Sequence, residues 1–149
     1  MITYRLASAE EIPVLCEIRK TQLQHEGIKP DINIDEELLE FFEEMFASKN
    51  LVEYVAEENG NIIATGAVVF YFYPPSYTNK SGKIAYITNM FTSPEYRRQG
   101  IATKMLKLLE DEAKRRNIHV MRLGASKLGR PVYEKFGFLQ DNEWLSKRI

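Results

Sequence analysis

The chain has 149 residues, of which 44% are hydrophobic and 28% charged, as is typical of one soluble globular domain, here expected over residues 1–149. The single cysteine excludes a disulfide framework, and no apolar run approaches the roughly 20 residues that cross a membrane, so we expect a cytoplasmic protein without a membrane partner. The net charge of −1, without a basic stripe that carries interleaved aromatic residues, argues against nucleic acid as a partner.

The hydrophobic pattern alternates between the periods of strands and helices along the chain. In chain order it predicts a strand over 2–6, a helix from the Ser8–Glu11 capping box to about Gly27, a second helix from Asp35, and strands over 51–57 and 62–73. It then predicts a strand over 84–92, a helix over 101–116, a strand over 120–125, a helix over 130–136 and a closing hairpin over 138–145. The Asn-Gly pair at 59–60 predicts a tight turn between its flanking strands. This order favours a mixed α/β sheet flanked by helices.

A short basic run, Tyr96–Gly100, lies immediately before the helix that begins at Ile101. The first N–H groups of a helix have no partner within it, and the helix dipole favours negative charge there. The small residues Gly100 and Ala102 would let a phosphate approach the backbone. A glycine near a helix start is more often structural, and the spacing matches neither G-x-G-x-x-G nor a P-loop. The motif alone therefore indicates only an anion at a helix start.

Two segments resemble motifs of the GCN5-related N-acetyltransferase (GNAT) superfamily. Residues 87–102, ITNMFTSPEYRRQGIA, resemble its acetyl-CoA-binding segment, and residues 130–138, RPVYEKFGF, resemble a segment near the end of such enzymes. The element order and the length match across essentially the whole chain. The resemblance implies a single-domain GNAT-like mixed sheet with splayed central strands, flanked by helices. It also implies an N-acetyltransferase with acetyl-CoA as co-substrate and no metal.

The resemblance further implies which residues hold the co-substrate. Backbone groups of Met90, Phe91 and Thr92 would contact the pantetheine arm of acetyl-CoA. Its pyrophosphate would be contacted by Arg98, Gln99, Gly100, Ile101, Ala102 and Thr103. Ser126 stands where members of the family often have an Asn that contacts the pantetheine arm, and its side chain is shorter.

Tyr133 stands where many members have a tyrosine that protonates the departing thiolate of CoA. The alternative is a tyrosine that packs a short helix against the sheet. Relatives often carry a Glu on the fourth or fifth strand as general base, but residues 84–92 and 120–126 contain no carboxylate. Proton removal could use water held by Thr88 or Asn89, an acid from the N-terminal helices, or no dedicated base.

The acceptor side of the sequence is acidic. Residues 31–44 contain seven acidic and no basic side chains, and in the family the first two helices help to wall the acceptor site. We therefore expect direct transfer to a small cationic amine in a ternary complex, although a solvated helix face explains the same acids. Tyr71, Tyr73 and Tyr77 could add aromatic faces for the amine. A non-catalytic acyl-CoA-binding module, a protein-lysine or N-terminal acetyltransferase, and a homodimer remain open.

Overall fold

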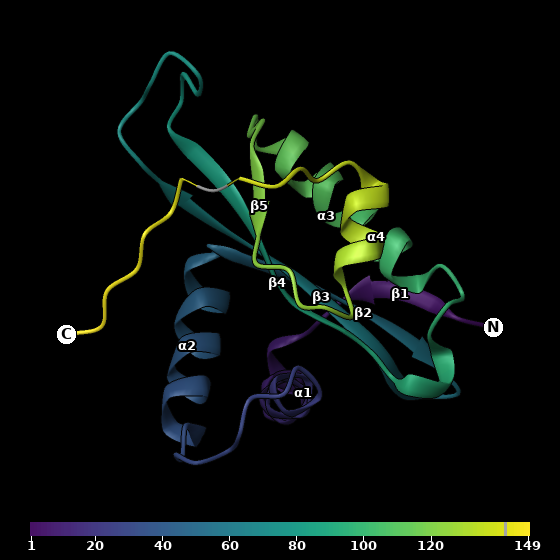
Figure 1. Cartoon of the computed structure of the whole chain (residues 1–149). Coiled ribbons are helices and arrows are strands. Elements are labelled where there is room, and N and C mark those ends of the chain that lie inside the picture. Colours follow the sequence, from purple (N-terminus) through teal and green to yellow (C-terminus); the bar gives the residue numbers. More distant parts are fainter. Residues whose placement is uncertain (142) are drawn as a thin grey trace.

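Five strands form one mixed sheet in the order β1-β2-β3-β4-β5, so strands adjacent in the sequence are adjacent in the sheet (Figure 1). The structure is a computed structural model that describes residues 1–141 and 143–149. The strands are β1 (Thr3–Leu6), β2 (Leu51–Glu58), β3 (Asn61–Phe72), β4 (Lys83–Thr92) and β5 (Met121–Leu123). The first four strands pair antiparallel, whereas β5 runs parallel to β4.

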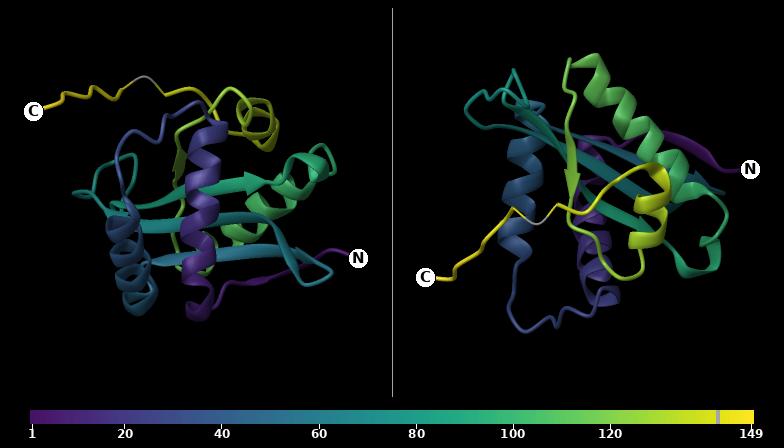
Figure 2. Two further views of the ribbon diagram at one scale, coloured as in Figure 1. Left: turned by 90° about the horizontal axis from the view of Figure 1, so that it is seen from below. Right: turned by 45° about the horizontal axis from the view of Figure 1, so that its top comes forward.

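Helices cover both faces of this sheet (Figures 1 and 2). They are α1 (Ile12–His25), α2 (Asp35–Ser48), α3 (Ile101–Arg115) and α4 (Arg130–Phe136), with short 3₁₀ turns η1 (Ala9–Glu11) and η2 (Pro94–Tyr96). α1 and α2 pack with Val55 on one face, and α3 packs on the other, with α4 beside it. Within the part of the chain that the structure describes, no helix is long and apolar enough to cross a membrane.

From the N-terminus to the end of α4, each predicted helix and strand is present, and its bounds agree with the prediction to within a few residues. The capping box of Ser8 and Glu11 is present at the start of η1. Asn59 and Gly60 both have positive φ, at 52° and 79°, and join β2 to β3 as the Asn-Gly signal predicts. The fold-class prediction, a mixed sheet flanked by helices, is therefore confirmed.

The predicted closing hairpin over 138–145 is wrong for the residues of that segment that the structure describes, because none of them is in a strand. Apolar and polar residues alternate in this segment, but too few of its apolar side chains pack against the core to stabilise a strand. Phe138 packs against the core, but Leu139 and Leu145 remain 90% and 95% exposed. Strand β5 is also shorter than the predicted 120–125 and covers only Met121–Leu123.

Strands β4 and β5 separate partway along their length. Their pairing covers only Ala85–Ile87 of β4, so β4 from Thr88 to Thr92 has no partner on that side among the described residues. The pairing of β4 with β3 also shifts register there, and Asn89 adopts a φ of 55°. The predicted splay of the central strands is therefore present, and it leaves main-chain polar groups available.

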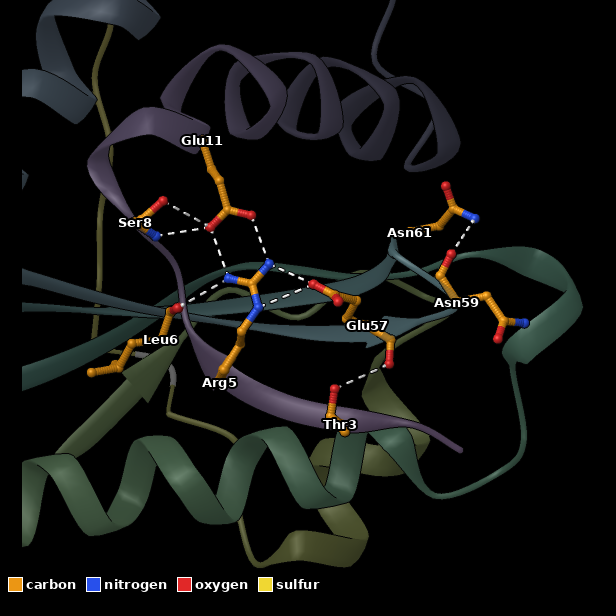
Figure 3. Close-up of polar contacts among 8 residues, drawn as sticks. All are labelled: Thr3, Arg5, Leu6, Ser8, Glu11, Glu57, Asn59 and Asn61. Atoms are coloured by element: carbon orange, nitrogen blue, oxygen red, sulfur yellow. Dashed lines mark hydrogen bonds and ion pairs between the residues drawn. The ribbon is translucent and has the colours of Figure 1, made fainter.

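A network around Arg5 joins β1 to the start of α1 and to β2 (Figure 3). The guanidinium of Arg5 donates to both carboxylate oxygens of Glu11, each at 2.8 Å, and to Glu57 Oε2 at 2.6 and 3.1 Å. Glu11 also accepts a hydrogen bond from the backbone N–H of Ser8 at 2.9 Å. One cation thus fixes two neighbouring segments, β1 and the turn before α1, to the distant strand β2.

Candidate active site

A cavity of about 110 Å³ lies where β4 and β5 separate. It is lined by residues of α1 and its C-cap, of β4, of β5 and the segment after it, and of α4: Arg19, Gln22, Glu26, Tyr86, Ile87, Thr88, Asn89, Met90, Leu123, Gly124, Ser126 and Tyr133. Three predicted site residues, Met90, Ser126 and Tyr133, therefore meet at one place. A larger cavity of about 600 Å³ lies at the outer edge of β5, and of the predicted residues it contains only Tyr133.

Tyr133 is held in the wall of the small cavity by the local geometry of α4. A Cβ on Gly129 would lie 2.6 Å from Cε2 of Tyr133, so only glycine leaves room for the ring one turn earlier. Burial, together with the negative charge of Glu26, raises the pKa of Tyr133 to about 12. The phenol therefore keeps its proton at neutral pH and can act as a hydrogen-bond donor.

Ser126 is engaged in starting α4. Its hydroxyl accepts a hydrogen bond from the N–H of Gly129 at 3.1 Å, and its carbonyl accepts one from the N–H of Arg130 at 2.9 Å. The side chain of Ser126 thus lies at the cavity, but its hydroxyl is already hydrogen-bonded within the turn before α4.

The loop before α3 has the geometry of an anion site. Arg98 and Gly100 both have positive φ, at 64° and 80°, and no side chain caps the first N–H groups of the helix. A Cβ on Gly100 would meet no atom within 4 Å, so the space beside the helix start is open. Ile101 is 3% exposed, so its side chain lies in the core and only its backbone faces that space. These features fit a pyrophosphate.

The predicted co-substrate residues fall into two groups that the end of β4 connects. One group comprises the loop before α3 and the first turn of that helix: Arg98, Gln99, Gly100, Ile101, Ala102 and Thr103. The other comprises Met90 and Ser126, which line the cavity beside the predicted catalytic residue Tyr133. Phe91 and Thr92 lie between these groups on β4. The ring of Phe91 packs 5.6 Å from that of His25, and the carbonyl of Thr92 accepts a hydrogen bond from Arg97 Nε at 3.0 Å.

A buried carboxylate that sequence reasoning missed lies directly behind the cavity. Glu53 of β2 is 4% exposed and accepts a 3.1 Å hydrogen bond from Nδ2 of Asn89, which lines the cavity. Burial raises the pKa of Glu53 to about 7, against the opposing effects of the Asn89 hydrogen bond and the charge of Arg19. The missed signal is a carboxylate on the inward face of an alternating strand, between Leu51 and Val55.

The acidic segment 31–44 contributes no residue to the lining of the small cavity. All seven acids in it are exposed, and Asp35 forms an ion pair with Lys20 of α1 at 2.8 Å. The aromatic residues also have other neighbours: Tyr71 packs on Tyr73 and Tyr86, Tyr73 packs on Trp144, and the side chain of Tyr77 is fully exposed. Among the described residues, no group of three His, Cys, Asp or Glu side chains is arranged to hold a metal.

Comparison with known proteins places this geometry in a family. The sequence matches the profile of the acetyltransferase (GNAT) family over residues 15–138. A search of curated proteins gave no match. The chain is similar to the structure of a predicted acetyltransferase with acetyl-CoA from Clostridium acetobutylicum, at 54% identity and a TM-score of 0.98, with 99% of this chain and 96% of that chain covered.

Two further structures share the fold at lower identity. A GCN5-related N-acetyltransferase from Ralstonia eutropha JMP134 has 22% identity and a TM-score of 0.93, with 100% of this chain and 99% of that chain covered. AAC(6')-Iy, solved with the bisubstrate analogue CoA-S-monomethyl-acetylneamine, has 17% identity and a TM-score of 0.79, with 100% and 98% covered.

The family match covers most of the chain, and the Clostridium protein, which is identical at more than half of its aligned positions, was crystallised with acetyl-CoA. The open space at the start of α3 and the end of β4, which β5 leaves unpaired on one side, fit that molecule, so acetyl-CoA is the co-substrate and the protein is an acetyltransferase. The chain belongs to the GNAT family of acetyltransferases.

Proposed function

We propose that residues 1–149 form one N-acetyltransferase domain that acts in the cytoplasm and transfers the acetyl group of acetyl-CoA directly to a small amine, whose amino group is cationic in solution. The observation that carries the proposal is the small cavity, where Tyr133 of α4 lies across from the unpaired end of β4. Two substrates held at this junction would react without a covalent enzyme intermediate, because positioning replaces a second encounter.

The co-substrate would bind along the gap between β4 and β5. In this arrangement the backbone groups of Met90, Phe91 and Thr92 pair with the pantetheine arm, as an added strand would. The pyrophosphate contacts the N–H groups between Arg98 and Thr103, where the helix dipole favours negative charge. The thioester then lies at the small cavity, and a backbone N–H near Phe91 stabilises the oxyanion.

The chemical step balances with two proton transfers. The amine first loses a proton to solvent, and the nitrogen of the neutral amine then attacks the thioester carbonyl, forms the new C–N bond and loses a proton to the base. The C–S bond then breaks, and the departing sulfur takes a proton from Tyr133. Glu26 lines the cavity and Glu53 lies behind it against Asn89, so these two carboxylates are the candidates to accept the proton of the amine. We assign this role to Glu53, through a water beside Asn89, because its pKa of about 7 suits a base at neutral pH.

The pKa of Tyr133 limits how much it can contribute. A phenol with a pKa of about 12 is about 3 to 4 units less acidic than a thiol with a pKa near 8.5, so proton transfer to the sulfur is uphill. We therefore place its contribution at the low end of the range for general acids, at about 100-fold. Most of this contribution comes from a hydrogen bond to the sulfur as negative charge develops.

The test is the release of free CoA thiol from acetyl-CoA, measured against a panel of small amines. We expect Tyr133→Phe to lower kcat by about 100-fold while leaving acetyl-CoA binding unchanged. Tyr77→Phe is the matched control, because the exposed ring of Tyr77 lies outside the cavity lining and its loss should have no effect. Full activity of Tyr133→Phe across the pH range would remove Tyr133 from the mechanism.

Calorimetry separates the enzyme from the alternative of a non-catalytic acyl-CoA-binding module. Binding of acetyl-CoA together with thiol release supports the proposal. Tight binding without turnover on any amine, including lysine side chains and peptide N-termini, would instead favour the module.

A further inference from the structure

Two polar residues of α1 and the residue that caps its C-terminal end form a row along one wall of the small cavity. Arg19, Gln22 and Glu26 are spaced at i, i+3 and i+7, which places them on one face of the helix over about 10 Å. Along this row, the guanidinium of Arg19 is followed by the amide of Gln22 and then by the carboxylate of Glu26. The Glu26 end acts electrostatically on Tyr133, and the Arg19 end acts on Glu53.

The amide in the middle of this row has an unused acceptor. Gln22 is only 7% exposed, and its Nε2 donates to Glu26 Oε2 at 2.9 Å. Its Oε1 is buried and accepts no hydrogen bond from any described residue. A buried acceptor left unpaired is costly, and a donor brought by a ligand would satisfy it. An amine N–H is such a donor, and the neighbouring carboxylate of Glu26 favours its positive charge.

The cation at the other end is also available. Arg19 is half-buried and makes no hydrogen bond or ion pair within the described residues, although it lines the cavity. It does not neutralise Glu53 by contact, because no ion pair joins the two side chains and the pKa of Glu53 stays raised. A guanidinium with free donors in a small cavity suits a planar or tetrahedral oxyanion.

We propose that the acceptor is an amine that also carries an anionic group, a carboxylate or a phosphate, with the anion bound by Arg19 and the amine held by Gln22 and Glu26. This assignment rests on the proposed acetyl transfer and names the substrate class for the same site. It differs from an acceptor that is cationic overall, because the cavity itself presents one cation and one carboxylate, whereas the acids of α2 face solvent.

The experiment compares acceptors in matched pairs by thiol release. Glycine is paired with glycinamide and β-alanine with β-alaninamide, which test a carboxylate at two spacings from the amine. The pair of 2-aminoethyl phosphate with ethanolamine tests a phosphate. We expect the anionic member of at least one pair to have a kcat/KM about 10- to 100-fold higher, the usual effect of a hydrogen bond to a charged group.

Variants of α1 then assign the preference to one residue. Arg19→Gln should lower kcat/KM for the anionic member much more than for the neutral member, so that the advantage of the anionic member is lost, and Arg19→Lys should restore part of that advantage. Gln22→Met should raise KM for both members alike. Lys20→Gln is the matched control, because it removes the cation at the next position of α1, which contacts Glu17 and Asp35 and does not line the cavity.

The outcomes separate this inference from the proposed function. Equal or better turnover of neutral amines in every pair would overturn the anionic acceptor and leave acetyl transfer in place. A preference that survives in Arg19→Gln, with acetyl-CoA binding intact by calorimetry, would also overturn it. Binding of acetyl-CoA without turnover on any acceptor would overturn the proposed function itself, and the acceptor assignment with it.

Discussion

Glu53 is a carboxylate on a strand face that is otherwise apolar. Leu51 and Val55, two positions away on either side, are 5% and 0% exposed, and Val55 packs against α1 and α2. Burying a carboxylate is costly, and the single hydrogen bond from Asn89 offsets only part of that cost. Since titratable groups with perturbed pKa values cluster where chemistry needs them, this residue is the best candidate for the missing base.

The variant Glu53→Gln tests that role. It keeps an oxygen that can accept the hydrogen bond of Asn89 but removes the group that takes up a proton. We expect kcat/KM to fall about 100-fold or more at pH 8, and the rise of wild-type activity with pH through about 7 to disappear. The measurement is a pH profile of kcat/KM with two acceptors whose amine pKa values differ. A rise of activity that is due to Glu53 occurs at the same pH with both acceptors, whereas a rise that is due to the amine shifts with the pKa of the amine.

Folding stability gives an independent readout for the same variant. The pKa of Glu53 is raised on folding, so the folded chain binds the extra proton and the wild type loses stability as pH rises from about 4.5 to about 7. Glu53→Gln should therefore gain stability relative to the wild type over that interval. Glu26→Gln serves as the comparison in the pH profile of activity. If activity still rose with pH through about 7 in Glu53→Gln, the role of the base would pass to Glu26.

At the scale of elements, the start of α3 depends on a backbone turn that only glycine adopts at low cost. Gly100 has a φ of 80°, and a side chain there would project into the open space proposed for the pyrophosphate. We expect Gly100→Ala to raise KM for acetyl-CoA about tenfold while kcat changes little, because about 1–2 kcal/mol of backbone strain displaces the binding groups. Steady-state kinetics with acetyl-CoA varied at saturating amine measures this effect.

Gly60→Ala is the control for that substitution. Gly60 has nearly the same φ, 79°, and its surroundings are equally open, but it lies in the β2–β3 turn. Both variants should lose similar stability in thermal unfolding, and only Gly100→Ala should bind acetyl-CoA more weakly. A similar rise of KM in both variants would trace the effect to general destabilisation.

Elements with local signals could be predicted from the sequence, and contacts between distant segments could not. Helix α3 begins where Gly100 and the apolar period predict, and α4 matches its predicted bounds because Pro131 and Gly137 mark its ends. The contact of Glu53 with Asn89 joins residues 36 positions apart, and it depends on the register shift in β4. Alternation alone predicted the closing hairpin, and it failed because too few of those side chains reach the core.

At the scale of the whole molecule, the sheet joins the proposed acceptor half of the site to the proposed co-substrate half. Helix α1 and its C-cap supply Arg19, Gln22 and Glu26 from one face, whereas the start of α3 supplies the backbone groups that we propose bind the pyrophosphate. Under the proposed function, the position of α1 on the sheet would therefore set the distance between the amine and the thioester. The Arg5 network holds the start of that helix to β1 and β2 (Figure 3).

This network makes a testable contribution to acid stability. The hydrogen bonds from Arg5, with that from Ser8, lower the pKa of Glu11 to about 2, below the usual value near 4.3. A depressed pKa gives stability that is complete above about pH 5 and is lost as pH falls toward about 2. Glu11→Gln should therefore cost about 1–2 kcal/mol at pH 7, because the pair is partly exposed and solvent screens it.

Urea unfolding at a series of pH values measures the difference between the wild type and Glu11→Gln. The difference should be constant from pH 7 to pH 5 and should shrink steadily below about pH 4, as the wild-type carboxylate becomes protonated. Glu10→Gln is the control, since the adjacent Glu10 is exposed and makes no ion pair within the described chain. A difference that stayed constant down to pH 2.5 would show that Glu11 stabilises the start of α1 through packing rather than through its charge on Arg5.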